Sequence, residues 1–177
     1  QDNKQQSAVD PHIWLDPENA KVITNRIVKI LSEYDPENSQ KYQRNGEKIN
    51  VRLSEMDQHL SLEMSEISDR SYLVLHDAYQ YFESRYQLNS AGSITINLDH
   101  FVGVRRLRKI QNMIKTNEVF CIFSEPQYSQ KLVETLIEGT SVKKGKLDPI
   151  GIDLVPGPEL YFDLMKNISI SLKSCLN

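Results

Sequence analysis

The spacing of apolar residues predicts two long helices in the first third of the chain. Apolar residues recur at three- and four-residue spacing over residues 22–34, which is the period of one helix face. Asp16-Pro17-Glu18 precedes this stretch and has the residues of a helix start. Asp35-Pro36-Glu37 repeats the start signal, so a second helix is expected there. Its apolar stripe reaches residue 67, which predicts a helix of about 30 residues, or about 45 Å.

From Ser68 onward, short apolar strands alternate with helices. The sequence predicts strands at residues 72–75, 93–96, 119–123 and 142–147, and helices at 104–116, 128–138 and 158–176. Alternation of this kind favours a mostly parallel sheet with helices on both faces. The predicted fold class is therefore α/β, with a long connecting helix followed by a mostly parallel four-stranded sheet flanked by helices.

Composition narrows the functional classes. The 177 residues are 39% apolar and 25% charged, as in ordinary globular proteins. A formal net charge of −3 gives no reason to expect a nucleic-acid partner, because phosphate binding needs concentrated Lys and Arg. No apolar run approaches the roughly 20 residues that cross a bilayer, so no membrane insertion is expected. The first nine residues lack both Met and an apolar core, so we expect the natural chain to begin upstream.

Two of the four histidines lie where a ligand could bind. His76 ends an apolar strand, and ligands of parallel sheets bind beyond such strand ends. His12 stands in an extended turn just before the first helix. His59, on a polar helix, is expected at the surface, and His100, in a loop, is expected to be structural or exposed.

Two carboxylates also follow predicted strands, namely Glu125 and Asp148. Imidazole nitrogen and carboxylate oxygen from His12, His76 and Asp148 would suit Zn²⁺, and also Mn²⁺ or Fe²⁺. Each of these residues, taken singly, is more often a hydrogen-bonded packing residue. Their wide spacing matches no metal motif, so the residues alone indicate a metal site only weakly.

The two cysteines, Cys121 and Cys175, are too few for a disulfide scaffold. They are either two unrelated buried thiols or one bridge that ties the end of the chain to an internal strand. A bridge would imply an oxidising compartment. The spacing leaves both readings open.

Four motifs carry a resemblance to a known family. They are Asp-Pro-His-Ile-Trp-Leu-Asp-Pro at 10–17, His-Asp-Ala-Tyr-Gln-Tyr-Phe at 76–82, Phe-Ser-Glu-Pro-Gln at 123–127 and Leu-Asp-Pro-Ile-Gly at 147–151. In this order they resemble the zinc and manganese solute-binding proteins of ABC importers, and most closely the zinc-uptake members. The resemblance runs from Asp10 to the end of the chain.

The resemblance implies a domain organisation. Family members have two α/β lobes that are joined by one long helix and hold the metal between them. Residues 1–34 then correspond to the end of the N-terminal lobe, 35–67 to the long connecting helix, and 68–177 to the C-terminal α/β metal-binding lobe. Most of the N-terminal lobe, with a further histidine ligand, would lie upstream. The apolar face of the first helix is therefore expected to lack its partner.

The resemblance also implies site residues. His12, His76 and Asp148 would be metal ligands, and Asp10, Asp77 and Glu125 could orient an imidazole N–H. Histidine rather than glutamate at position 76 favours Zn²⁺ over Mn²⁺, since nitrogen ligands suit zinc better. The resemblance further implies a Cys121–Cys175 disulfide and a Gram-negative periplasm.

The implied function is the metal-binding component of a periplasmic ABC importer, which delivers zinc to its membrane permease and is not an enzyme. One alternative is a zinc hydrolase with a metal-bound water and Glu125 as general base. The sequence contains no nucleophile elbow, phosphate loop or His-Glu-x-x-His motif to support it. Another alternative is a truncated remnant without a competent metal site, which acts only as a structural or adhesive module.

Overall fold

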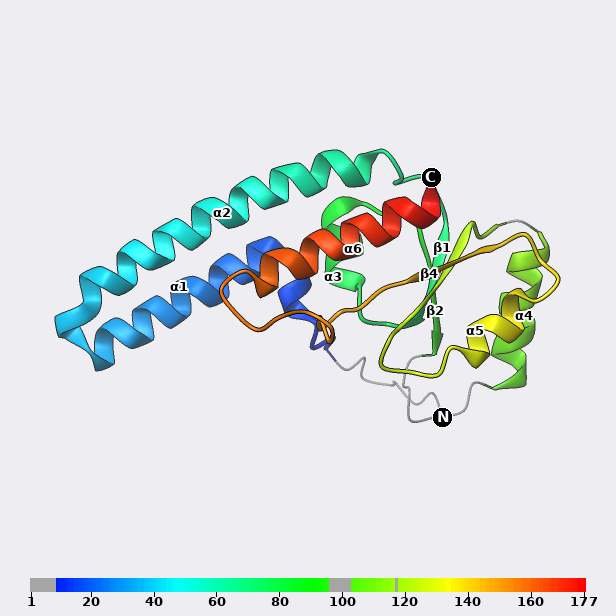
Figure 1. Ribbon diagram of the computed structural model, residues 1–177, viewed down its shortest axis with the longest axis horizontal. Coiled ribbons are helices and arrows are strands. Elements are labelled where there is room, and N and C mark those ends of the chain that lie inside the picture. The colour runs from blue at the N-terminus through cyan, green and yellow to red at the C-terminus, as the bar shows by residue number, and fades with distance from the viewer. Residues whose placement is uncertain (1–8, 96–102, 117) are drawn as a thin grey trace, which may run out of the picture.

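A hairpin of two long helices extends from an α/β layer (Figure 1). The computed structural model describes residues 9–95, 103–116 and 118–177. Helix α1 spans Pro17–Tyr34 and begins as predicted, because the Asp16 carboxylate accepts a hydrogen bond of 2.8 Å from the Glu18 N–H. Helix α2 spans Ser39–Ser65, 27 residues. The two long helices predicted from the sequence are thus confirmed.

The residues of the second predicted helix start, 35–37, do not form the first turn of an α-helix. Pro36–Asn38 forms a short 3₁₀ helix (η2) that reverses the chain between α1 and α2. The Asp35 carboxylate accepts hydrogen bonds from the Asn38 amide and the Tyr42 hydroxyl, at 2.8 and 2.7 Å. These bonds stabilise the turn, so α2 begins a few residues later than the signal indicated.

The two helices come into close contact at Gly46. This residue is buried on α2, and a Cβ atom built on it would lie 2.6 Å from Val28 Cγ2 on α1. Real Cβ atoms essentially never make contacts this short. Val28 cannot easily move aside, because a β-branched side chain in a helix is held in one χ1 rotamer.

Gly46→Ala is therefore expected to destabilise the chain by about 1 kcal/mol, although alanine gains about 1 kcal/mol of helix propensity over glycine. The substitution should cost nothing in a Val28→Ala background, where the methyl group that it meets is gone. Urea unfolding of both single variants and the double variant should give a coupling energy of about 1–2 kcal/mol. Strict additivity would contradict close packing of α1 on α2 at this point.

One face of α1 carries the exposed apolar residues that the resemblance predicted. Ile23 is 36% exposed, Ile27 is 51% exposed and Tyr34 is 87% exposed. In a stably folded monomer such residues are usually scattered, whereas here they share one helix face. Within the described parts of the chain, none of the helices combines the length and the apolar character needed to span a bilayer.

The sheet has four parallel strands in the order β2-β1-β3-β4. The strands are β1 (Tyr72–His76), β2 (Ser90–Thr95), β3 (Cys121–Ser124) and β4 (Lys143–Lys146). The parallel four-stranded sheet expected from the sequence is confirmed. Strand β2 begins three residues earlier than predicted, at Ser90, which pairs with Tyr72. β1 and β3 occupy the centre, so their ends lie side by side.

Helices cover both faces of the sheet (Figure 1). Alternate residues of β1 point to opposite faces: Tyr72 and Val74 belong to one core cluster, and Leu73 and Leu75 to the other. The first cluster includes residues of α2, α3 (Gln80–Tyr86) and α6 (Leu160–Leu176); the second includes residues of α4 (Val104–Lys115) and α5 (Lys131–Ile137). The sequence did not predict α3, which has only seven residues.

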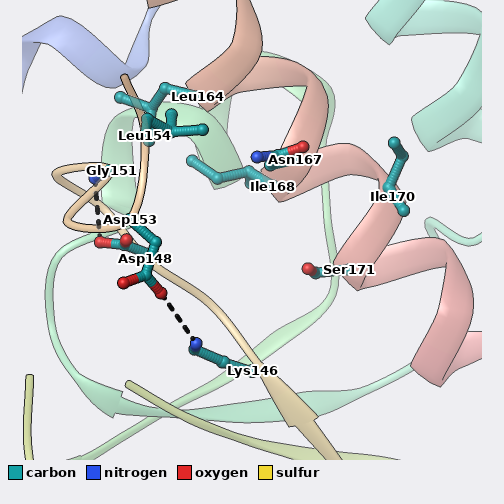
Figure 2. Close-up of a pocket in the computed structure, with 10 residues that line it drawn as sticks. All are labelled: Lys146, Asp148, Gly151, Asp153, Leu154, Leu164, Asn167, Ile168, Ile170 and Ser171. Atoms are coloured by element: carbon teal, nitrogen blue, oxygen red, sulfur yellow. Dashed lines mark hydrogen bonds and ion pairs between the residues drawn. The ribbon is translucent and has the colours of Figure 1, made fainter. Parts of the chain in front are cut away.

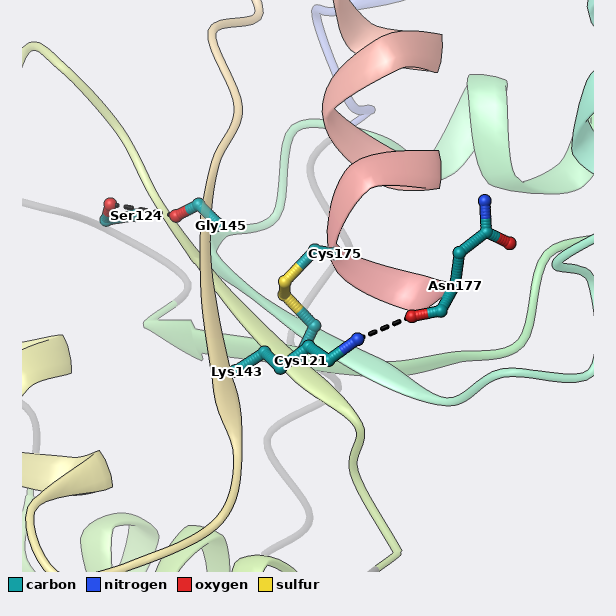
Figure 3. Close-up of a disulfide and its surroundings, with 6 residues drawn as sticks. All are labelled: Cys121, Ser124, Lys143, Gly145, Cys175 and Asn177. Atoms are coloured by element: carbon teal, nitrogen blue, oxygen red, sulfur yellow. Dashed lines mark hydrogen bonds between the residues drawn. A yellow bond between two sulfur atoms is a disulfide. The ribbon is translucent and has the colours of Figure 1, made fainter.

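A disulfide joins Cys121 in β3 to Cys175 in the last turn of α6, with 6.0 Å between the two Cα atoms (Figure 3). Beside it, the Lys143 amine donates a hydrogen bond of 2.5 Å to the Asn177 carbonyl. Both cysteines are buried. The predicted disulfide is thus present, and it fixes the last helix to the central part of the sheet.

Candidate metal centre

His76 stands at the carboxyl end of β1 and contacts the carboxylate that follows β3. Its Nδ1 atom lies 2.5 Å from Glu125 Oε1, and Glu125 is 1% exposed. The contact arises because β1 and β3 are neighbours in the parallel sheet. With the proton on Nδ1 donated to this carboxylate, Nε2 presents a lone pair, which is the form that binds metals.

His12 has the same kind of carboxylate partner. Its Nδ1 atom lies 2.6 Å from Asp10 Oδ1, and its backbone N–H donates a bond of 2.9 Å to the same oxygen. His12 directly precedes the short 3₁₀ helix η1 (Ile13–Leu15), which leads into α1. The side chain of His12 is 17% exposed and that of His76 is 14% exposed. Both imidazoles are therefore oriented by a carboxylate and remain accessible to a small ion.

The two imidazole rings are adjacent, although they lie far apart in the sequence. Their centroids are 5.3 Å apart, and the ring planes are inclined by 61°. Two imidazoles that share a tetrahedral zinc ion have centroids about 5 Å apart, because each Zn–N bond is about 2.0–2.1 Å. The spacing of the rings thus suits two nitrogen ligands on one zinc ion.

Residues 10–15, which we call the docked segment, are attached to the C-terminal part of the chain by three hydrogen bonds. The Trp14 indole N–H donates to the Pro149 carbonyl at 2.9 Å. The Tyr161 hydroxyl donates to the Trp14 carbonyl at 2.8 Å, and the Tyr81 hydroxyl donates to the Asp10 carbonyl at 3.3 Å. The sequence analysis did not assign these roles, although Trp14, Tyr81 and Pro149 all lie inside the four motifs. Their position inside these motifs was the only feature of the sequence that could have indicated these roles.

Asp148 organises the turn that follows β4. Its carboxylate accepts hydrogen bonds from the backbone N–H groups of Ile150, Gly151 and Ile152 at 3.1, 2.9 and 2.6 Å. Figure 2 shows the bond from Gly151. The Gln127 side-chain amide donates a further bond of 2.6 Å. These bonds occupy both carboxylate oxygens, and the histidines are not among its partners.

The remaining candidates differ in their surroundings. Asp77 accepts a hydrogen bond of 2.7 Å from the Gln80 side chain. Across the described ranges, no group of three or more His, Cys, Asp or Glu residues is arranged to hold a metal ion. His59 is 73% exposed on α2, as predicted. His100 lies outside the described residues.

The surroundings of the two histidines are rich in carboxylates. Tyr79 is 2% exposed, and burial, reinforced by the negative charges of Glu125 and Asp148, raises the pKa of this phenol well above its usual value. One carboxylate oxygen each of Asp10 and Glu125, and the Tyr79 hydroxyl, are buried without a hydrogen-bonding partner among the described residues. Acceptor oxygens in such surroundings favour a cation, so the donor set fits a divalent metal.

Comparison with known proteins places this arrangement in a family. The model of the family "ZnuA: Zinc-uptake complex component A periplasmic" matches residues 1–175. The high-affinity zinc uptake system protein ZnuA of Brucella suis is 41% identical over 168 residues, which are 95% of this chain and 50% of that protein. The chain therefore spans about half the length of the curated relatives that it matches.

Solved structures share the fold. A zinc-bound variant of AdcAII from Streptococcus pneumoniae is 30% identical with a TM-score of 0.79, over 95% of this chain and 62% of that one. A crystal structure of a ZnuA protein superposes with a TM-score of 0.84 over 100% of this chain and 64% of that one, at 24% identity. From the family match over nearly its whole length, the chain belongs to the family of the periplasmic zinc-uptake component ZnuA.

Proposed function

We propose that this chain is part of the zinc-binding component of a periplasmic ABC importer, which hands the ion to a membrane permease. The observation that carries the proposal is the adjacent pair of imidazoles, His12 and His76, each held at Nδ1 by a carboxylate. In this arrangement both Nε2 atoms are free to bind the transported ion. Zinc is the cargo, so the site must bind it tightly and release it unchanged.

The proposal includes the domain organisation inferred from the resemblance. Residues 1–34 would close an N-terminal lobe, 35–67 would form the connecting helix, and 68–177 would form the metal-binding C-terminal lobe. Asp148 would supply a carboxylate ligand, and the other lobe would supply a further ligand. The exposed apolar face of α1 is the surface against which that lobe would pack.

Zinc is proposed over manganese because the two donors that the structure brings together are nitrogens. Nitrogen ligands favour Zn²⁺, whereas Mn²⁺ prefers oxygen. The relatives support this choice, since the Brucella suis protein is named for zinc uptake and the AdcAII variant is zinc-bound.

Transport is proposed over hydrolysis because of the position of Glu125. A hydrolase needs a base that reaches the metal-bound water. Glu125, the candidate base, is buried and contacts His76 Nδ1, on the side of the ring opposite Nε2. It is therefore placed to orient a ligand and not to accept a proton from water.

The proposal is tested by titrating the chain with Zn²⁺ and Mn²⁺ in competition with a chelator. We expect one zinc ion per chain and weaker binding of manganese. The remnant alternative predicts instead that zinc binds weakly and without defined stoichiometry. Preference for manganese would contradict the assignment of the cargo.

Glu125→Gln is expected to weaken zinc binding by about 10- to 100-fold, because glutamine keeps an acceptor for His76 but removes the negative charge that makes the imidazole a better donor. Glu47→Gln, at an exposed position on α2, is the matched control and should leave the affinity unchanged. The same titration measures both variants. Equal affinity of Glu125→Gln and the unmodified chain would exclude a role for this carboxylate in the site.

A further inference from the structure

Helix α4 concentrates positive charge on one face of an acidic chain. It contains Arg105, Arg106, Arg108, Lys109 and Lys115, and no acidic residue. The whole chain carries a net charge of −3. The rest of the chain is therefore clearly negative, and α4 gives the molecule a charged pole.

Four of these cations point away from the core. Ile110 and Ile114 are buried against the sheet, while Arg105, Arg108, Lys109 and Lys115 are exposed. At 100° per residue, these four lie within one arc opposite the two isoleucines. Arg106 lies at the edge of the arc and donates to the Ser93 carbonyl. We call the other four the basic stripe; it runs about 15 Å along the helix, at 1.5 Å per residue.

An ordinary solvated helix surface would mix both signs of charge, and α1 does so. Lys21 lies 2.6 Å from Glu18, and Lys29 lies 4.0 Å from Glu33. Within the described ranges, by contrast, no residue of the basic stripe takes part in an ion pair. Uncompensated like charges on one helix repel each other, so the stripe is a surface that an external anion would stabilise.

We propose that the basic stripe of α4 binds the anionic surface of a phospholipid bilayer. The stripe is on the exposed side of α4, and α4 packs on the face of the sheet opposite α6 (Figure 1). Two of the stripe's four cations are lysines, which are depleted in protein–protein interfaces, and its exposed side chains include no aromatic residue or methionine, which are enriched there together with arginine. A fluid layer of anionic headgroups needs no shape complementarity and gains from each Lys or Arg near it. This property is separate from zinc binding by His12 and His76.

The test is cosedimentation of the 177-residue chain with vesicles. We expect binding to phosphatidylcholine vesicles that contain phosphatidylglycerol, none to pure phosphatidylcholine, and weakening as ionic strength rises to about 0.15 M. Arg105→Gln with Arg108→Gln should lower the affinity about 25-fold at low salt, since each cation contributes about fivefold. Arg44→Gln with Lys48→Gln removes the same charge from α2 and should change the affinity less than about twofold.

Three results would overturn the proposal. Vesicle binding that does not depend on phosphatidylglycerol excludes an anionic surface as the partner. Equal losses in the α4 and α2 variants assign binding to net charge alone. Retention on immobilised polyglutamate without vesicle binding, lost in the α4 variant, indicates an acidic protein as the partner instead. The zinc titration of the α4 variant should be unchanged, which separates this outcome from that of the proposed function.

Discussion

Replacing His76 with asparagine is expected to weaken zinc binding more than a hundredfold. Structural zinc sites bind with apparent free energies of about 10–16 kcal/mol over four ligands, so one ligand accounts for about 3 kcal/mol. Asparagine was chosen because its side-chain amide can occupy the place of Nδ1 and donate to Glu125, while it lacks Nε2. Glu125, which is 1% exposed, therefore keeps a hydrogen-bonding partner, and the fold should be retained.

A chelator competition assay measures the loss, with thermal unfolding beside it to show that the variant is folded. His59→Ala is the control, because His59 is 73% exposed on α2 and is not one of the proposed metal ligands. If the two rings share one ion, His12→Ala should show a loss of similar size. Unchanged affinity in a folded His76→Asn variant would remove His76 from the site and with it the proposed function.

Removing the disulfide is expected to lower the free energy of unfolding by about 4 kcal/mol. Cys121 and Cys175 are 54 residues apart in the sequence, and closing a loop of this length restricts the unfolded chain by about that amount in the chain-entropy model. In a protein of this size the loss corresponds to a fall of roughly 8–16 °C in the melting temperature. The double variant with alanine at both positions should unfold accordingly at lower urea concentration.

Reduction of the unmodified chain serves as the control for this variant, because it opens the same loop without removing sulfur atoms from the core. Both samples should lose stability to a similar extent. Zinc affinity, measured well below the melting temperature, should fall only a few-fold, since Glu125 is held by the pairing of β3 with β1 and β4. A loss of stability below about 1 kcal/mol would contradict the chain-entropy account of this bridge.

Most of the elements that the sequence predicted correctly have a clear apolar pattern of their own. α1 and α2 have apolar stripes, and β1 and β3 are continuous apolar runs between polar turns. α3 was missed because its seven residues offer too few turns for a periodic pattern. The beginning of β2, Ser-Ala-Gly, carries no apolar signal and becomes a strand through pairing with Tyr72. In these cases tertiary contacts and not local preference decide the structure.

The site was predictable only in part, for a related reason. The end of β1 marked His76 as a ligand candidate, and the motif marked His12. The contact between His76 and Glu125 depends on β1 and β3 being neighbours in the sheet. The order of the strands cannot be predicted from the sequence of any single segment. Likewise, the bond from Trp14 to Pro149 joins residues 135 positions apart. Asp148 was expected as a ligand, whereas its partners in the structure are three backbone N–H groups of its own turn and the Gln127 side-chain amide.

Anchoring of the docked segment has a consequence for how long an ion would stay bound. Because Trp14, Tyr161 and Tyr81 hold residues 10–15 in place, the two imidazoles are brought together when the chain folds and not when the ion arrives. Binding then requires little loss of conformational freedom. Escape of the ion would require separation of the imidazoles, and hence local opening of these three hydrogen bonds. If the proposed function holds, the residence time of the metal would thus be governed by the opening rate of this six-residue segment.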